Sequence, residues 1–265
     1  MTVMTNFVYL LGPAGCGKST LTSALSDTMR TSGLEVLTVN LDPGVEWLPY
    51  TPEIDIRKHI SLREVMREFR LGPNGALVVS VDLIVDHLPK LREVISAWNP
   101  DYVLVDTPGQ MELFAFRETG PTVVRAMAAR EHSLILFLID TFLARRPSSF
   151  ISMLMLSTSV LSRFRIAQLN VLTKSDLLEP EVVESISDWV SRKDVLLENL
   201  EKEENPLNRE NTKMILEAVE GMGMAGELLP VSATEGTGMV ELVSAIERVF
   251  SAEQRLDVQE EVEKF

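Results

Sequence analysis

Residues 12–20 read GPAGCGKST and match the phosphate-binding pattern G-x-x-x-x-G-K-S/T in full. The pattern follows an apolar run and precedes a helical pattern, which is the context that this motif requires. Glycines allow backbone N–H groups to wrap around phosphates, and the N-terminus of the following helix adds positive potential. We therefore expect phosphate contacts from Gly12, Pro13, Ala14, Gly15, Cys16, Gly17, Lys18, Ser19 and Thr20.

Side chains of this loop have the chemistry for separate tasks. Lys18 is expected to reach the β- and γ-phosphates and to act in catalysis, and Ser19 to place its hydroxyl on Mg²⁺. Thr20 is expected to contact the α-phosphate, and Cys16 is interpreted as a small filler rather than a nucleophile. The alternative is a glycine-rich turn that contains Lys-Ser by chance, which the strand–loop–helix context disfavours.

The segment VDTPGQ, residues 105–110, ends another apolar run. A carboxylate at the end of a strand, here Asp106, is suited to hold magnesium through water. Gly109 can turn its N–H toward a γ-phosphate. The alternative for Asp106 is a buried aspartate that caps the next turn.

The segment TKSD, residues 173–176, could read a nucleotide base. A carboxylate at Asp176 can accept both guanine donors, N1–H and the N2 amino group, and the stem of Lys174 can lie against the base. The alternative is a helix N-cap at Ser175 or Asp176. The order of the motifs favours base recognition, and backbone N–H groups of a later segment, SAT, would complete the pocket at Ser232, Ala233 and Thr234.

The motifs must be positioned by the elements that carry them. Short apolar runs predict buried strands at 7–11, 35–41, 102–106, 133–140, 166–173 and 228–232. Helical patterns predict helices near 18–31, 59–69, 88–98, 121–130, 147–163, 181–200, 207–220 and 238–250. About sixty residues separate the second and third strands, so a parallel crossover is favoured over a hairpin. The alternation predicts an α/β fold with a doubly wound, mainly parallel sheet and helices on both faces, as in P-loop NTPases.

We expect one P-loop domain over residues 1–250 and a charged tail over 251–265 that is a frayed helix or disordered. The Glu-rich stretch near 178–227 is expected to be a helical insertion, because an apolar run returns to the sheet after it.

Composition narrows the class of protein. The chain has 265 residues, and its 25 basic and 39 acidic side chains give a net charge of −14. Such a chain repels nucleic acid, and no basic stripe offsets the charge. The single cysteine excludes an intramolecular disulfide and fits a reducing compartment. The N-terminal apolar run is too short for a signal sequence or a membrane span, so we expect a cytoplasmic protein without membrane contact.

The stretch RLGPNGALVV, residues 70–79, is expected by composition alone to be a turn. Gly72 and Gly75 can take positive φ, Pro73 fixes its own φ, and Asn74 tolerates the left-handed region.

The combined motifs resemble the GPN-loop GTPases. The resemblance covers most of the chain and comprises GPAGCGKST, NLDPGVE (40–46), DIR (55–57), GPN (72–74), DTPGQMELF (106–114), TKSD and SAT in that order. It implies the SIMIBI class of P-loop GTPases, a homodimer, and magnesium-dependent hydrolysis of GTP to GDP and phosphate. It also implies that the Gly-Pro-Asn loop of one subunit reaches the nucleotide site of the other, which makes Asn74 a catalytic residue in trans.

The chain departs from the family pattern at two places. Thr173 stands where the family motif Asn-Lys-x-Asp has Asn, the residue that ties the base loop to the phosphate loop, so we expect weaker guanine binding. Residues 13–17 lack the extra lysine found in many relatives, and we expect Asn74 of the partner to fill part of that role.

The resemblance also assigns roles near the attacking water. Asp42 would orient or deprotonate that water or bind Mg²⁺ through water, and an Asx turn before Pro43 is an equally weighted alternative. Gln110 is the second candidate for orienting the water. Switch or dimer contacts are expected of Glu46, Asp55 and Arg57.

Three classes of function fit these residues. The leading one is a GTP-hydrolysing homodimer that switches shape as an assembly factor or chaperone, and by resemblance to eukaryotic relatives its client would be an RNA polymerase assembly intermediate. The second is a P-loop kinase acting on a small molecule or a polynucleotide end, with LARRPSS (143–149) as its arginine lid. A kinase has no need for TKSD and SAT at consecutive strand ends. The third is a scaffold with a permanently bound nucleotide.

Overall fold

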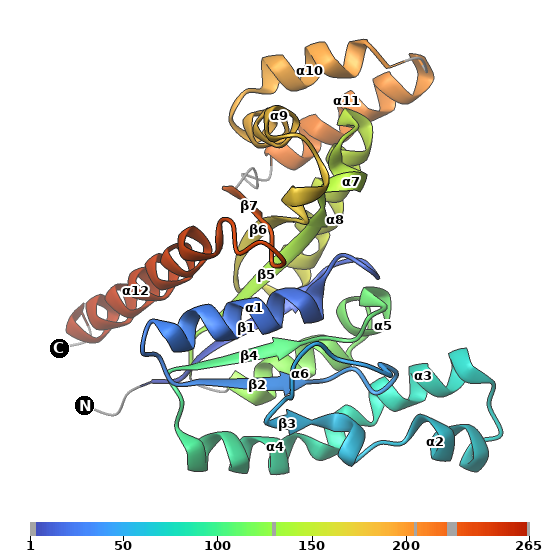
Figure 1. Cartoon of the computed structure of the whole chain (residues 1–265), viewed down its shortest axis with the longest axis vertical. Helices are drawn as coiled ribbons and strands as arrows, with labels where there is room; N and C mark the ends of the chain where they lie inside the picture. Colours follow the sequence, from blue (N-terminus) through green and yellow to red (C-terminus); the bar gives the residue numbers. More distant parts are fainter. Residues whose placement is uncertain (1–3, 129–130, 204–205, 222–226, 264–265) are drawn as a thin grey trace.

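The computed structural model describes residues 4–128, 131–203, 206–221 and 227–263. These residues contain a seven-stranded sheet with the order β3-β2-β4-β1-β5-β6-β7, and every strand pairing is parallel (Figure 1). Its strands are β1 (Asn6–Leu11), β2 (Val36–Asn40), β3 (Ile54–Asp55), β4 (Tyr102–Asp106), β5 (Ser133–Asp140), β6 (Ala167–Thr173) and β7 (Leu228–Val231). All six predicted strands are confirmed, and so is the parallel crossover between the second and third of them. Only β3, which has two residues, was not predicted.

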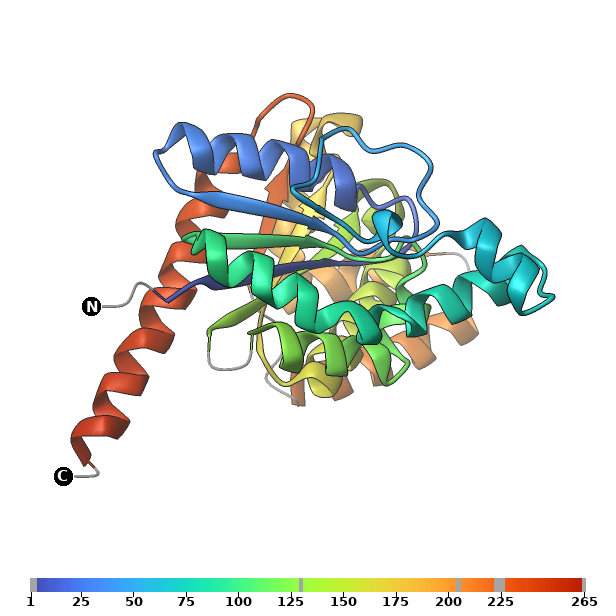
Figure 2. The ribbon, with the colours of Figure 1, turned by 90° about the horizontal axis from the view of Figure 1, so that it is seen from below.

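The two faces of the central strand β1 belong to separate hydrophobic clusters. Phe7, Tyr9 and Leu11 pack under α4 (Ile84–Trp98), α6 (Thr119–Ala128) and α8 (Pro147–Phe164). Val8 and Leu10 pack under α1 (Lys18–Thr31) and α12 (Met239–Glu263) on the other face (Figure 2). The doubly wound prediction is confirmed, since an apolar strand covered on both faces is typical of such a sheet.

The strand order reverses at β1, which lies between β4 and β5. In open α/β sheets, ligands bind beyond the carboxyl ends of the strands at such a switch point. The phosphate loop leaves β1 at this point, so topology places the predicted motifs along one edge of the sheet.

The Gly-Pro-Asn stretch begins a helix, so the predicted turn is wrong. Gly72 is the N-cap of α3 (Pro73–Asp82), with φ −73°, and Pro73 occupies the first turn. Proline is tolerated there because the first N–H groups of a helix lack intrahelical partners. The left-handed residue of this connection is Arg70, with φ 54°, at the end of α2 (Leu62–Glu68).

Other helices differ from their predicted bounds. The predicted helix 181–200 is two helices, α9 (Pro180–Ser191) and α10 (Lys193–Glu201), and α11 (Pro206–Gly221) follows. The short helices α5 (Met111–Ala115) and α7 (Thr141–Ala144), and the 3-10 turns η1 (Ile56–Lys58) and η2 (Ser175–Leu177), were not predicted. The helix α12 runs on through the charged tail to Glu263. The last two residues of the predicted helix 121–130 lie outside the described residues.

The helices α9, α10 and α11 gather at one end of the molecule, beyond the β5–β6–β7 side of the sheet (Figure 1). The hairpin of α2 and α3 projects at the other end, beyond the carboxyl edge of the sheet (Figures 1 and 2). Within the described ranges, no helix has both the length and the apolar character to cross a bilayer.

Candidate nucleotide-binding site

The phosphate loop takes a path that only glycine tolerates. Gly12, Gly15 and Gly17 have φ values of 156°, 77° and 96°. A Cβ on Gly12 would lie 2.6 Å from the carbonyl oxygen of Leu138 and 2.8 Å from Cys16 Sγ. The loop therefore fits tightly against β5 while its backbone curls ahead of α1.

Lys18 and Cys16 have different roles in the loop. The Lys18 ammonium donates hydrogen bonds to the carbonyl oxygens of Gly12 (2.8 Å), Pro13 (3.2 Å) and Gly109 (3.1 Å). It thus links the phosphate loop to the loop after β4. Cys16 is buried, and this burial raises the pKa of its thiol, as expected of a packing residue. The side chain of Ser19 is partly exposed and that of Thr20 exposed, both in the first turn of α1.

Asp106, at the end of β4, is the most deeply buried carboxylate of the edge, with 1% exposure. Burial raises the pKa of Asp106 to about 6, although the nearby Ser19 hydroxyl, the hydrogen bond from Tyr50 and the charge of Lys18 oppose the shift. The Tyr50 hydroxyl donates to Asp106 Oδ2 at 3.0 Å, whereas Oδ1 is buried without a hydrogen-bond partner among the described residues. Burial and the Asp106 charge raise the pKa of Tyr50, so its hydroxyl is a protonated donor.

These residues fit a magnesium ion. Mg²⁺ prefers oxygen ligands and is held by one or two carboxylates, waters and substrate phosphates. The buried, unpartnered oxygen of Asp106 beside the Ser19 hydroxyl provides such a donor set. The charge of Asp42 also acts on Asp106, which brings the third predicted metal residue into the same neighbourhood.

Both carboxylate oxygens of Asp42 accept hydrogen bonds from the backbone. Oδ1 accepts from Gly44 N at 2.8 Å, which is the Asx turn considered above. Oδ2 accepts from Gly109 N at 2.6 Å, so the N–H that we expected at a γ-phosphate bonds Asp42 in this structure. Asp42 therefore joins the loops that follow β2 and β4.

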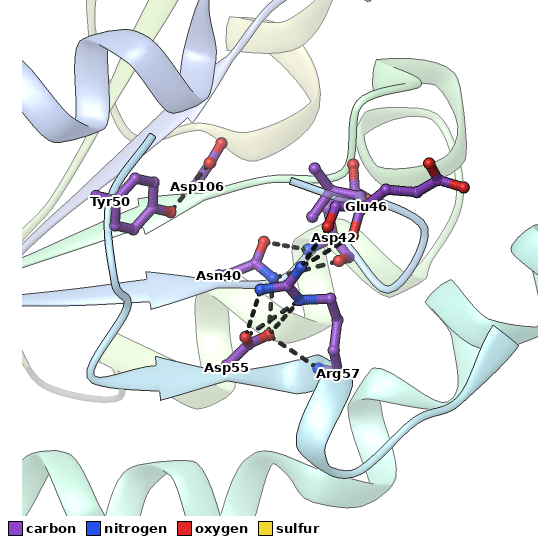
Figure 3. Close-up of polar contacts among 8 residues, drawn as sticks. Asn40, Asp42, Glu46, Tyr50, Asp55, Arg57 and Asp106 are labelled. Atoms are coloured by element: carbon purple, nitrogen blue, oxygen red, sulfur yellow. Dashed lines mark hydrogen bonds and ion pairs between the residues drawn. The ribbon is translucent and has the colours of Figure 1, made fainter. Parts of the chain in front are cut away.

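A network behind Asp42 holds its loop in place (Figure 3). The Asn40 amide donates to Asp55 at 2.9 Å, and its oxygen accepts from Asp42 N at 3.0 Å. Arg57 forms a forked ion pair with Asp55 and donates to the carbonyl oxygen of Val45 at 3.0 Å. Burial favours the neutral form of Asp55, but the bonds from Arg57 and Asn40 outweigh it and hold the pKa of Asp55 below its usual range.

The predicted base residues line one pocket of about 200 Å³ at the ends of β6 and β7. It is lined by Gly17, Thr20, Leu21, Thr173, Lys174, Asp176, Leu177, Val231, Ala233 and Thr234. The pocket thus joins the base segment directly to the first turn after the phosphate loop. Ser232 is fully buried instead, and its hydroxyl accepts from Glu235 N at 3.1 Å within the turn after β7.

Two bonds tie the base segment to the phosphate loop. The Thr173 hydroxyl donates to the Cys16 carbonyl oxygen at 2.8 Å and lies 3.2 Å from that of Ile139. The Lys174 ammonium donates to the Gly15 carbonyl oxygen and pairs with Asp140, both at 2.6 Å.

The remaining predicted residues do not join this cluster. Asn74 is exposed in the first turn of α3, and the start of α3 lies at the outer end of the α2–α3 hairpin (Figures 1 and 2). Gln110 is exposed at the N-cap of α5. Leu77, one turn after Asn74, packs closely on the Asp42 turn, because a Cβ on Gly44 would lie 2.8 Å from Leu77 Cδ1.

Sequence reasoning missed several residues of the site. Asp140 ends β5 as Asp106 ends β4, so its strand-end position was a usable signal. Thr141 donates a short hydrogen bond to the Thr173 carbonyl oxygen. Asn40 ends β2 and had the same positional signal, whereas nothing in the sequence pointed to Tyr50.

The comparisons with known proteins agree with this geometry. A family model described as "Conserved hypothetical ATP binding protein" matches residues 10–252. GPN-loop GTPase 3 of Debaryomyces hansenii is 34% identical over 97% of this chain and 95% of that protein. The Saccharomyces cerevisiae GPN-loop GTPase 3 is 32% identical over 91% of each chain. GPN-loop GTPase 1 of Dictyostelium discoideum is 31% identical, and the chain spans 60% of its length. A crystal structure of a GTPase in apo form from Pyrococcus abyssi has a TM-score of 0.79 at 30% identity, covering 94% of this chain and 98% of that one.

Proposed function

Because the chain belongs to the family of GPN-loop GTPases and is a GTP-hydrolysing enzyme, we propose that it works as a magnesium-dependent homodimeric switch. Each GTP site would take its phosphate loop, metal ligands and base pocket from one subunit and Asn74 from the other. The observation that carries the proposal is the continuous pocket in which Asp176 and Lys174 adjoin Gly17 and Thr20.

Base selection follows from the donors and acceptors of this pocket. Asp176 is exposed at the pocket lining, and an ionised carboxylate has only acceptors to offer. Guanine presents two adjacent donors, N1–H and the N2 amino group, whereas adenine lacks this pair. Lys174, held by Asp140 and Gly15, contributes its stem to the wall of the pocket.

Phosphate chemistry would occur between the phosphate loop and the loops after β2 and β4. Ser19 and Asp106 would hold magnesium, which, when bound, neutralises charge on the phosphate oxygens. Lys18 would give up its bonds to backbone carbonyls and donate to the phosphates. Asp42 is the proposed water-orienting group, and Gln110 is the second candidate.

The position of Asn74 supports its proposed role in the partner subunit. Asn74 is exposed on a hairpin that projects away from the body of the chain, so its amide is available to another molecule. Leu77 of the same helix packs on the Asp42 turn, so a contact made by Asn74 could reach the chain's own water-orienting residue.

The proposed biological role is that of a cytoplasmic assembly factor or chaperone-like switch with a protein client, such as an RNA polymerase assembly intermediate. The net charge of −14 argues against direct nucleic-acid binding. We also propose a helical insertion near 178–227, which is supported by the helices α9, α10 and α11 in the described part of this stretch.

The test is phosphate release by the purified full-length protein with magnesium and either GTP or ATP, without an acceptor. Release that is selective for GTP supports the proposal. Release that depends on an added acceptor would indicate a kinase, and binding without turnover would indicate a scaffold.

A further inference from the structure

Tyr50 connects the loop between β2 and β3 to the carboxylate proposed to hold magnesium. Its hydroxyl donates to Asp106 Oδ2 at 3.0 Å, and its ring is partly buried beside the end of β4 (Figure 3). The contact joins residues 56 positions apart in the chain. It is separate from the hydrogen-bond network of Asn40, Asp55 and Arg57 (Figure 3).

We propose that the Tyr50 hydroxyl competes with magnesium-bound water for Asp106 and thereby sets the magnesium concentration that the GTPase requires. This inference rests on the magnesium site proposed above. Tyr50 is a positioning residue in this account, because it acts on the metal through Asp106.

The competition follows from the geometry of magnesium binding. Mg²⁺ demands near-octahedral geometry and keeps several waters, and a carboxylate that binds it through water must accept hydrogen bonds from them. The phenol already donates to one of the two oxygens of Asp106. One magnesium-bound water can use Oδ1 of Asp106, which is free of partners among the described residues, but a second water needs Oδ2. Hydrogen bonds to an ionised acceptor are among the stronger ones, so this second water has to displace a favourable contact with Tyr50.

The same contact restrains a defined segment of the loop. Before this segment, Asp42 is held by Gly109 N, and the carbonyl oxygen of Val45 by Arg57. After it, Glu53 accepts from Thr38 N at 2.7 Å and from Thr38 Oγ1 at 2.6 Å. Release of Tyr50 would therefore loosen residues 46–52 and leave both ends of the loop anchored, since Arg57 also donates to the Glu46 carbonyl oxygen at 3.5 Å and Pro52 is buried.

Trp47 lies in this segment and is 75% exposed, and Glu46 and Thr51 are also exposed. Leu48 and Pro49 are partly buried and Pro52 is buried, so the Tyr50 bond adds to the limited packing of the segment. Magnesium binding would thus increase the mobility of residues 46–52 at the surface of the molecule.

The test compares Tyr50→Phe, which removes the hydroxyl and keeps the ring, with the full-length wild type. A fluorescent GDP analogue is titrated at increasing Mg²⁺ concentrations. We expect the half-saturating Mg²⁺ concentration to fall by about tenfold to 100-fold in Tyr50→Phe, since one hydrogen bond to a charged group is removed. Tyr102→Phe is the matched control, because Tyr102 lies at the opposite end of β4, and it is expected to behave as wild type.

An unchanged Mg²⁺ requirement in Tyr50→Phe would overturn the proposal. An increased requirement would also overturn it and would mean that the hydroxyl orients Asp106 for the metal. Asp106→Asn, measured in parallel, separates this inference from the proposed function. If wild type shows no Mg²⁺ dependence, or Asp106→Asn retains it, the magnesium site and the inference both fail. If Asp106→Asn loses the dependence and Tyr50→Phe matches wild type, only the inference fails.

Hydrogen exchange of residues 46–52, measured by mass spectrometry, gives a second readout. Mg²⁺ and GDP should increase exchange in wild type, and Tyr50→Phe should show the increased exchange before Mg²⁺ is added. Equal exchange in all of these samples would contradict the proposal that the Tyr50–Asp106 contact restrains residues 46–52.

Discussion

The Thr173 hydroxyl donates a hydrogen bond of 2.8 Å to the Cys16 carbonyl oxygen and joins two loops that are 157 residues apart. The bond links the base segment to the phosphate loop, a task that an asparagine performs in the family motif. A hydroxyl at this position therefore reaches the phosphate loop directly, and Lys174 adds a second link through Gly15.

Removal of this hydroxyl should weaken guanine nucleotide binding. Thr173→Val keeps the shape of a buried side chain but removes its hydrogen-bond donor. The net contribution of one hydrogen bond, about 0.5–1.5 kcal/mol, corresponds to a roughly twofold to tenfold rise in the GDP Kd. Titration calorimetry measures the change. Thr5→Val is the control, because the Thr5 hydroxyl makes a comparable bond of 2.9 Å to Pro100 at the opposite edge of the sheet. Equal GDP affinity in both variants would show that the Thr173 bond does not shape the pocket.

The choice of base should depend on Asp176. Asp176→Asn should lose GTP affinity by about 1.5–3 kcal/mol, because a charge-assisted pair is removed. It should gain affinity for xanthosine triphosphate, since asparagine offers a donor to the xanthine carbonyl. Calorimetry with both nucleotides tests this exchange, and unchanged GTP binding would show that Asp176 does not recognise the base.

Substitutions of Lys18 and Asp42 should have different effects on nucleotide binding and on the rate of GTP hydrolysis. Lys18→Ala should raise the nucleotide Kd, because it would remove the phosphate contact that we propose for Lys18 in the ground state. Asp42→Ala should leave the Kd nearly intact and lower kcat by about 100-fold, since a water-positioning group acts mainly in the transition state.

Asp42→Asn is the matched control for this pair. It keeps an oxygen that can accept from Gly44 N and removes the charge, so it distinguishes lost chemistry from a loosened turn. A Kd for Asp42→Ala that rises in step with the loss of rate would reassign the residue to ground-state or magnesium binding.

Asn74 should act in the partner's site. Asn74→Ala and Asp42→Ala should each hydrolyse GTP slowly, and mixing the two proteins with subunit exchange should restore activity. Half of randomly exchanged dimers are mixed, and each mixed dimer has one intact site, so about a quarter of wild-type activity is expected. Native mass spectrometry verifies exchange. Mixed dimers without recovery would place Asn74 in its own chain's site or outside catalysis.

The contact between Gly44 and Leu77 should limit what the Asp42 turn tolerates. Gly44→Ala would bring a Cβ to 2.8 Å from Leu77 Cδ1, and overpacking of this kind costs about 1–3 kcal/mol. Urea unfolding measures the loss, and Gly221→Ala, which meets open space at the end of α11, is the control. The double variant Gly44→Ala/Leu77→Ala should lose less stability than the two single losses added together. Additive losses would show that the two residues do not interact.

The sequence by itself determined the sheet and the ends of its strands. Six apolar runs predicted six strands, because strands buried on both faces must be apolar nearly throughout. Parallel strands bring their carboxyl ends to one edge, so Lys18, Asp106 and Asp176 could be assigned to one edge before any coordinates. The glycines of the phosphate loop were equally predictable, since their positive φ values exclude most other residues.

Only the tertiary structure decided which loops cross and what their side chains contact. The Gly-Pro-Asn stretch has the composition of a turn, but packing of Leu77 on Gly44 and burial of Ala76 accompany a helix that starts at Pro73. Tyr50 reaches Asp106 from a loop whose path depends on the anchors at Asp42 and Glu53. Local sequence specifies the periodicity of an element, but a contact between distant loops depends on the whole sheet being assembled, and no local pattern encodes it.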